Sequence, residues 1–182
     1  MPSKPVKEIT VIEPTPHNPN RKRKSTGGVI VDGEDGCAVK FAKCCNPLPG
    51  EDIIGFITKG YGISIHKADC PNISNAYANE ENVNRFVKAE WDMPSSGSYQ
   101  AAYEADIQIL VTNRISILAD ISVALADMKV DIVSISSRNM DSTTLISMTI
   151  SCKDINHFNS ILSRLRNIKD VIRATRVIGT SV

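Results

Sequence analysis

Aromatic residues and long hydrophobic runs are both scarce in this chain of 182 residues, of which 5% are aromatic. Its apolar stretches fall far short of the roughly 18–20 residues that a membrane-spanning helix needs. The first ten residues, MPSKPVKEIT, lack the apolar stretch of a secretory signal peptide. We therefore expect a cytoplasmic protein with no membrane partner, in a compartment that keeps thiols reduced.

Net charge is nearly absent as well, because 21 Lys and Arg residues face 20 Asp and Glu residues and leave +1. This balance excludes a uniformly basic nucleic-acid-binding protein and a strongly acidic tail protein. The charge is unevenly placed, since residues 1–26 carry six basic and two acidic side chains. Their prolines predict a flexible basic tail or linker that ends in Arg21, Lys22, Arg23 and Lys24. That run is interpreted either as a solvated linker end or as an arm that contacts phosphate groups.

Glycine and proline are missing from most of the second half. All nine prolines lie at or before Pro94, and eight of the ten glycines lie between Gly27 and Gly62. This asymmetry predicts two units of different build, at 27–93 and 101–180, joined by a linker at 94–100.

The first unit is predicted to be β-rich. Short apolar stretches alternate with turn sequences such as NPLPG at 46–50 and KGYG at 59–62. The polar stretch at 71–84 is compatible with a short helix.

The second unit has the periodicity of a βαββαβ fold. Residues 103–111 alternate between apolar and polar, and the apolar residues of 117–128 recur at helical spacing. Two β-branched runs meet at Asp141, and Asp154 is placed to cap a second helix before a final strand at 170–178. The order is that of a ferredoxin-like domain, so the whole chain is predicted to be of the α+β class.

The five cysteines are an odd number, which makes a complete disulfide framework a poor interpretation. Metal ligands and buried free thiols remain. Cys37 and Cys152 fall on apolar strand faces and are expected to be small core residues.

The other three cysteines and one histidine form a candidate zinc site: Cys44, Cys45, His66 and Cys70. His66 and Cys70 are four residues apart, and the Asn-Pro sequence after Cys45 lets both adjacent sulfurs turn toward one point. Three thiolates and one imidazole complete a tetrahedral Cys₃His site with no open position, which would be structural rather than catalytic. The alternative is three buried cysteines and a hydrogen-bonded histidine.

The sequence around these residues resembles a known family. The string FAKCCNPLPG at 41–50, followed by IGFIT, GISIH and DCPN, closely resembles the zinc-finger-like (ribosome-intersubunit) domain of long RelA/SpoT-homologue enzymes. Those enzymes synthesise and hydrolyse the alarmone (p)ppGpp in the bacterial stringent response. Residues 101–178 are similar to the ACT domain that follows in that family. The four candidate zinc ligands match the family's Cys-Cys, His and Cys positions.

The family's catalytic residues have no counterpart in this sequence. The metal-binding His-Asp pair of its hydrolase is absent, and so is a GxxxxGK[ST] phosphate-binding loop. We therefore expect a non-catalytic regulatory region of a GTP pyrophosphokinase, either a piece of a longer enzyme or a naturally short protein. The resemblance implies three partners: the ribosome, uncharged tRNA and the catalytic half of the enzyme.

Two further sets of residues follow from the resemblance. The first is a set of candidate RNA contacts, in which Tyr61 would stack on a base and the others would meet phosphates: Arg21, Lys22, Arg23, Lys24, Lys43, Lys59, Tyr61 and Lys67.

The second set is a candidate effector site at the first strand–helix turn of the ACT unit, where ACT domains often bind amino acids such as branched-chain ones: Asn113, Arg114, Ile115, Ser116, Ile117 and Leu118. Ser116 stands where the family usually has glycine, so its Cβ would crowd an effector. Homodimerisation through the sheet edges of the ACT unit is a third interpretation.

Overall fold

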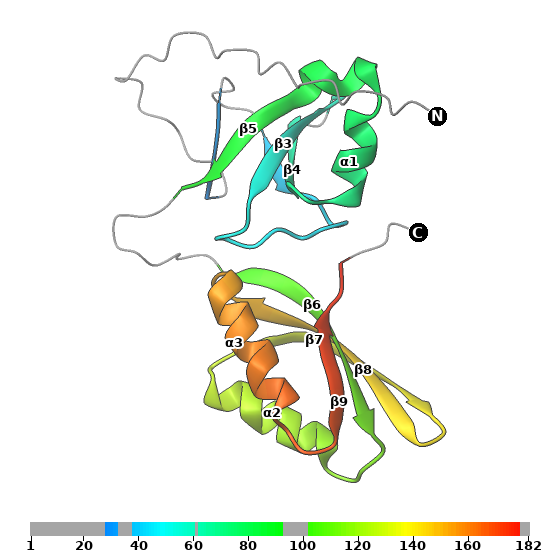
Figure 1. Cartoon of the computed structure of the whole chain (residues 1–182). Helices are drawn as coiled ribbons and strands as arrows, with labels where there is room; N and C mark the ends of the chain where they lie inside the picture. The colour runs from blue at the N-terminus through cyan, green and yellow to red at the C-terminus, as the bar shows by residue number, and fades with distance from the viewer. Residues whose placement is uncertain (1–27, 33–37, 61, 93–101, 179–182) are drawn as a thin grey trace, which may run out of the picture.

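The computed structural model describes residues 28–32, 38–60, 62–92 and 102–178, which form two β-sheets with their helices (Figure 1). We call residues 28–92 the first unit and residues 102–178 the second unit. Four features expected from the sequence lie outside the described residues: the tail at 1–26 with its Arg21–Lys24 run, the linker at 94–100, Cys37 and Tyr61. Within the described part of the chain, no helix is long and apolar enough to cross a membrane.

The first unit contains a five-stranded sheet in the order β1-β5-β3-β4-β2. Its elements are β1 (Val29–Val31), β2 (Val39–Phe41), β3 (Ile53–Thr58), β4 (Gly62–Lys67), α1 (Pro71–Tyr77), the 3₁₀ helix η1 (Glu80–Arg85) and β5 (Phe86–Trp91). Strand β3 pairs antiparallel with both β4 and β5, whereas β2 pairs parallel with β4. Strand β2 is therefore a short edge strand of three residues.

A small core holds this sheet together. Val29, Ile63, Ile65 and Ala89 are buried on it, with Val39 and other partly buried apolar residues packed against them. The expected helix at 71–84 is present as α1 and η1, and α1 begins at Pro71, where proline fits because a first-turn N–H has no partner within the helix.

The second unit confirms the predicted βαββαβ order. Its elements are β6 (Tyr103–Thr112), α2 (Ile117–Asp127), β7 (Ile132–Met140), β8 (Thr143–Cys152), α3 (Ile155–Arg166) and β9 (Val171–Arg176). The four strands form an antiparallel sheet in the order β7-β8-β6-β9, and both helices lie on one side of it (Figure 1). The α+β class is confirmed.

Periodicity explains why these residues form these elements. Strand β6 alternates strictly between buried residues and residues open to solvent. Helix α3 buries Phe158, Ile161, Leu162 and Leu165 on one face, and the Asp154 carboxylate caps it by accepting the His157 N–H at 2.7 Å.

The two units meet along a packed boundary. Leu48 of the first unit is completely buried in the same apolar cluster as the core of the second unit. The rings of Phe41 and Trp91 stack at 5.6 Å, and both meet the Tyr103 ring edge-on. The loop after β2 therefore lies between the two sheets, as Figure 1 shows.

Candidate metal centre

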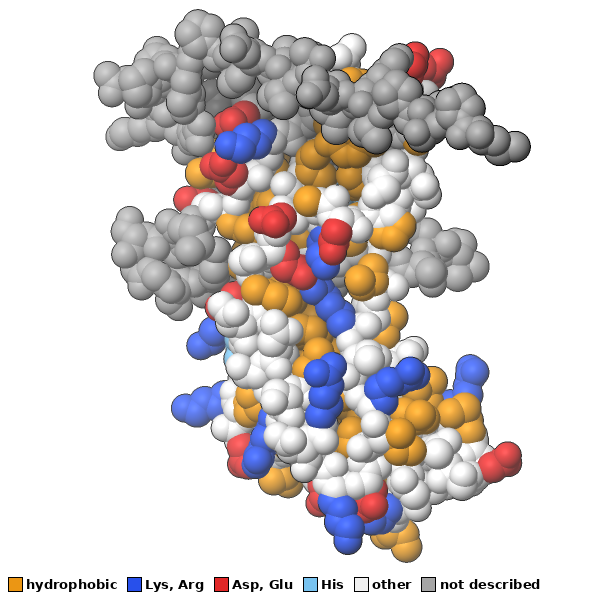
Figure 2. Space-filling model, viewed as in Figure 1, with side chains coloured by type: hydrophobic (Ala, Val, Ile, Leu, Met, Phe, Trp, Pro, Cys, Tyr) orange, Lys and Arg blue, Asp and Glu red, His pale blue; other side chains and the backbone are white. Residues whose placement is uncertain are grey.

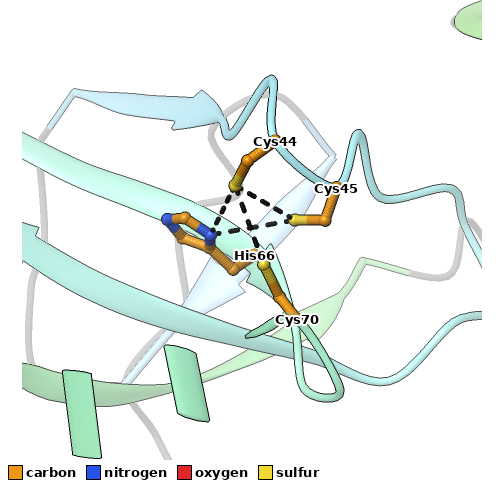
Figure 3. Close-up of side chains that lie close together, drawn as sticks. All are labelled: Cys44, Cys45, His66 and Cys70. Atoms are coloured by element: carbon orange, nitrogen blue, oxygen red, sulfur yellow. Dashed lines mark hydrogen bonds between the residues drawn. The ribbon is translucent and has the colours of Figure 1, made fainter. Parts of the chain in front are cut away.

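Four side chains from three segments of the first unit converge (Figure 3). Cys44 and Cys45 lie on the turn after β2, which is held by hydrogen bonds from the Cys45 and Asn46 N–H groups to the Ala42 carbonyl. His66 is the penultimate residue of β4, and Cys70 is the residue just before α1. A strand end, a tight turn and a helix start therefore supply the four groups.

Their spacing fits a tetrahedral metal ion. The Cys44 sulfur lies 3.4 Å from His66 Nδ1, 3.7 Å from the Cys70 sulfur and 3.9 Å from the Cys45 sulfur. All four ligand atoms lie within 4.8 Å of one another. Zinc–sulfur bonds of about 2.3 Å at tetrahedral angles would place sulfurs about 3.8 Å apart. The cluster could therefore hold a metal ion through three sulfurs and Nδ1 with little rearrangement.

Burial makes the metal-free cluster an unfavourable place for charge. Cys45 and Cys70 are 0% and 2% exposed and pack with Ile73. Burial raises the pKa of the Cys45 thiol to about 12, against a smaller opposing effect of the Lys67 N–H, which donates to its sulfur at 3.3 Å. Burial also lowers the pKa of His66. A bound cation would favour the thiolates that these surroundings otherwise disfavour, and its binding would release protons.

The described cysteines fall into two groups, the three of the Cys–His cluster and one in the second unit. The four cysteines within the described residues are free thiols: Cys44, Cys45, Cys70 and Cys152. Cys152 is 2% exposed in the core of the second unit, and burial raises the pKa of its thiol to about 11. It is a core residue, as expected.

The predicted RNA contacts within the described residues differ in their surroundings. Lys43 and Lys59 are exposed, next to the Cys–His cluster and at the opposite end of the β3–β4 hairpin respectively. Lys67 is 15% exposed, and its ammonium pairs with Glu51 at 3.2 Å and Asp69 at 3.4 Å. Its charge is therefore paired with carboxylates of the first unit.

The predicted effector turn is occupied by the protein's own side chains. The Arg114 guanidinium pairs with Asp120 at 2.6 Å and with Asp170 at 2.9 Å. Ser116 has a left-handed backbone (φ +77°), and its hydroxyl does not cap α2. Ile115 is 96% exposed. The turn therefore keeps the backbone that suits glycine while carrying a serine.

Of the remaining residues of this turn, one is hydrogen-bonded, one is buried and one is exposed. Asn113 accepts a hydrogen bond from the Thr144 hydroxyl at 3.1 Å. Ile117 is buried at 6% exposure, whereas Leu118 is 43% exposed.

Sequence reasoning missed a partly buried ion pair at the boundary between the units. Arg176 and Glu51 are 12% and 10% exposed and lie 2.7 Å apart. Arg176 belongs to no motif of the sequence, and a glutamate after a Pro-Gly turn carries no signal of its partner. The pair is 125 residues apart, so no local pattern could have found it.

Two family models match this chain. Residues 29–92 match the RelA/SpoT RIS domain, and residues 99–176 match an ACT domain. The first match contains all four residues of the Cys–His cluster.

Curated relatives match almost the whole chain. A GTP pyrophosphokinase of Escherichia coli K12 is 34% identical over 166 residues, which are 90% of this chain and 22% of the relative. A bifunctional (p)ppGpp synthase/hydrolase RelA of Mycobacterium tuberculosis is 35% identical over 166 residues, with the same coverage. The chain thus spans about a fifth of the length of these relatives. A solved ACT domain from the GTP pyrophosphokinase of Chlorobium tepidum covers 42% of this chain and 100% of its own length, at 17% identity and a TM-score of 0.39.

Proposed function

Because this chain belongs to the RelA/SpoT family, with an RIS domain followed by an ACT domain, we propose that it is a non-catalytic regulatory region that docks on ribosomes carrying uncharged tRNA. Through that docking it controls the catalytic domains of a (p)ppGpp synthetase/hydrolase. We place the linker between its two domains at 94–100, between β5 and β6. The observation that carries the proposal is that the RIS match coincides with a Cys₃His cluster whose geometry suits a metal.

The metal of this site is proposed to be zinc in a structural role. Three sulfurs and one imidazole leave no position for a reacting water, so the ion would hold the fold and take no part in a reaction. The first unit has a small apolar core and short strands, and a domain of this size often needs such a staple. Elemental analysis of protein purified without chelator should give about one zinc per chain, and less than half an equivalent would count against the site.

Exposed basic side chains support an RNA partner. Lys43 and Lys59 are exposed on the first unit, and Lys and Arg side chains gather over the second unit on the face seen in Figure 2. Four exposed basic residues of that unit lie in the last turn of α3, in the loop after it and on β9: Arg164, Arg166, Lys169 and Arg173.

Charge reversal tests this assignment. Replacing both Lys43 and Lys59 by glutamate should weaken ribosome binding and make its salt dependence shallower, because each lost phosphate contact lowers the logarithmic slope by about one. Replacing Asp52 and Glu81, which are also exposed, by lysine changes the charge by the same amount in the opposite direction and should not weaken binding. An unchanged slope in the lysine-to-glutamate variant would refute the contribution of these two lysines.

A second candidate function is homodimerisation through the edge strand β7. All nine of its residues are exposed, and they include the apolar side chains of Ile132, Val133, Ile135 and Met140. A long exposed edge with unpaired backbone groups favours pairing with another strand. Sedimentation analysis over a range of concentrations should show dimers that Ile135→Lys disrupts, whereas a concentration-independent monomer would exclude this function.

Amino-acid sensing at the first turn of the second unit has weaker support. Arg114 already pairs with two carboxylates there, and an effector carboxylate would have to displace them. Calorimetric titration with branched-chain amino acids distinguishes the two roles of the ACT unit, and we expect no heat of binding at millimolar ligand.

A further inference from the structure

We propose that the 46–51 segment couples the Cys–His cluster to the second unit, so that a metal ion held by the cluster also fixes the second unit against the first. This inference rests on the metal site of the proposed function. It concerns what the bound ion does at a distance, beyond holding its own four ligands.

The segment begins directly at the ligands. Asn46 follows Cys45, has a positive φ of +44°, and donates its N–H to the Ala42 carbonyl at 2.8 Å. The turn that aims both sulfurs at the cluster therefore also sets the direction in which the 46–51 segment leaves. Because Asn46 is bonded directly to Cys45, a shift of the two cysteines also shifts the start of the 46–51 segment.

Asn46 and Pro49 of this segment make three hydrogen bonds to the second unit. The Asn46 side chain donates to the Glu104 carbonyl at 2.8 Å, and its own carbonyl accepts from Arg176 Nη2 at 2.5 Å. The Pro49 carbonyl accepts the N–H of Ile155, the first residue of α3, at 2.9 Å. Between these contacts lies Leu48, which is fully buried in the apolar cluster of the second unit.

Glu51 closes the path back to the cluster. Its carboxylate meets Arg176 of the second unit at 2.7 Å and Lys67 of the first unit at 3.2 Å. Lys67 follows His66 in the chain, and its N–H donates to the Cys45 sulfur at 3.3 Å. The Trp91 indole N–H donates to the Glu51 carbonyl at 2.8 Å. Both ends of the six-residue segment are thus connected to the Cys–His cluster, and both also contact the second unit.

The entropy cost of ordering the 46–51 segment explains why a bound metal ion would strengthen the boundary. Fixing the backbone of one residue costs about 1–2 kcal/mol of conformational entropy, so ordering six residues needs strong contacts at both ends. A metal ion supplies such contacts at Cys44 and Cys45. Without it, the same turn is held by backbone hydrogen bonds and weak thiol contacts, and the contacts with the second unit open more often. Because coupling between two binding events is reciprocal, weakening the boundary must also weaken metal binding by the same factor.

Amide hydrogen exchange of the full chain, followed by NMR, measures this coupling at single residues. The Ile155 N–H bonds across the boundary, whereas the nearby Phe158 N–H bonds within α3 to the Asp154 carbonyl at 3.0 Å. Removing zinc with a chelator should speed exchange at Ile155 by about tenfold or more while Phe158 changes less than about twofold. Unchanged exchange at Ile155 in protein shown by metal analysis to have lost its zinc would overturn the coupling and leave the metal site standing.

A reciprocal measurement keeps the test decisive if the metal-free chain loses its structure altogether. Arg176→Met removes the hydrogen bond to the Asn46 carbonyl and the ion pair with Glu51 without touching a ligand, and Glu51 keeps Lys67 as a partner. Arg173→Met is the matched control, since Arg173 is exposed on the same strand. In competition with a chromophoric chelator, zinc affinity should fall at least about threefold in the Arg176 variant and stay unchanged in the Arg173 variant. Equal affinities in the two variants would overturn the coupling, and a wild-type chain that binds no zinc would overturn the metal site and the coupling together.

Discussion

Replacing Leu48 by alanine tests whether the two units share one core. Leu48 belongs to the loop of the first unit, yet it is 0% exposed within the apolar cluster of the second. Truncating a buried leucine costs about 2–5 kcal/mol, depending on how far the surroundings collapse. Pro47 and Pro49 are both buried and have fixed φ angles, which limit collapse, so we expect about 3 kcal/mol. For a chain of this size that loss corresponds to a melting temperature lower by about 6–12 °C.

The assay is urea denaturation followed in parallel by tryptophan fluorescence and far-ultraviolet circular dichroism. Trp91 is the only tryptophan of the chain and lies at the boundary, so its fluorescence reports that region, whereas circular dichroism reports both units. The matched control is Leu118→Ala, the same truncation at a side chain that is 43% exposed, with an expected change within about 0.5 kcal/mol. Equal midpoints in the two variants would refute the shared core.

Three further substitutions test individual backbone and capping arguments by the free energy of unfolding. Ser116→Gly should stabilise the chain by about 1 kcal/mol, because φ is +77° at that position, and an unchanged midpoint would refute the strain. Gly50→Ala should destabilise it by about 1–2 kcal/mol, since φ is +93° and an added Cβ would lie 2.9 Å from Ile155 Cγ2; a neutral result would show that the loop adapts. Asp154→Ala should cost about 1 kcal/mol through loss of the cap on the His157 N–H, and Asp154→Asn should retain most of it, so equal losses in both would contradict the capping argument.

The fold of the second unit was predictable because its signals are local. The strict alternation of β6 and the four-residue apolar face of α3 repeat within single elements, so the sequence alone determines their type. The first unit was less so, since β1 and β2 have three residues each, too few for a period to be recognised. The parallel pairing of β2 with β4 joins residues about 24 apart and depends on the whole sheet.

The candidate metal centre was predictable from residue chemistry and spacing. Cysteines and histidines near the ends of strands and turns are so few in this chain that the four members of the cluster could be grouped from the sequence. The boundary between the units was not, because Leu48, Glu51 and Arg176 are ordinary residue types whose partners lie far away in the sequence. These residues have a structural role because they are buried at the boundary. Their burial depends on the tertiary structure and cannot be predicted from the local sequence. Lys67 shows the same effect, since its ion pairs use the charge that the sequence assigned to RNA.

Co-sedimentation with ribosomes over a series of salt concentrations tests the proposed regulatory role most directly. The chain should be incubated with ribosomes that hold uncharged tRNA, aminoacylated tRNA or no tRNA, and pelleted in each state. We predict pelleting that is strongest with uncharged tRNA and that falls steeply as salt rises. Pelleting that is the same in all three states, or absent at low salt, would contradict the assignment of this chain as the region that docks on ribosomes carrying uncharged tRNA.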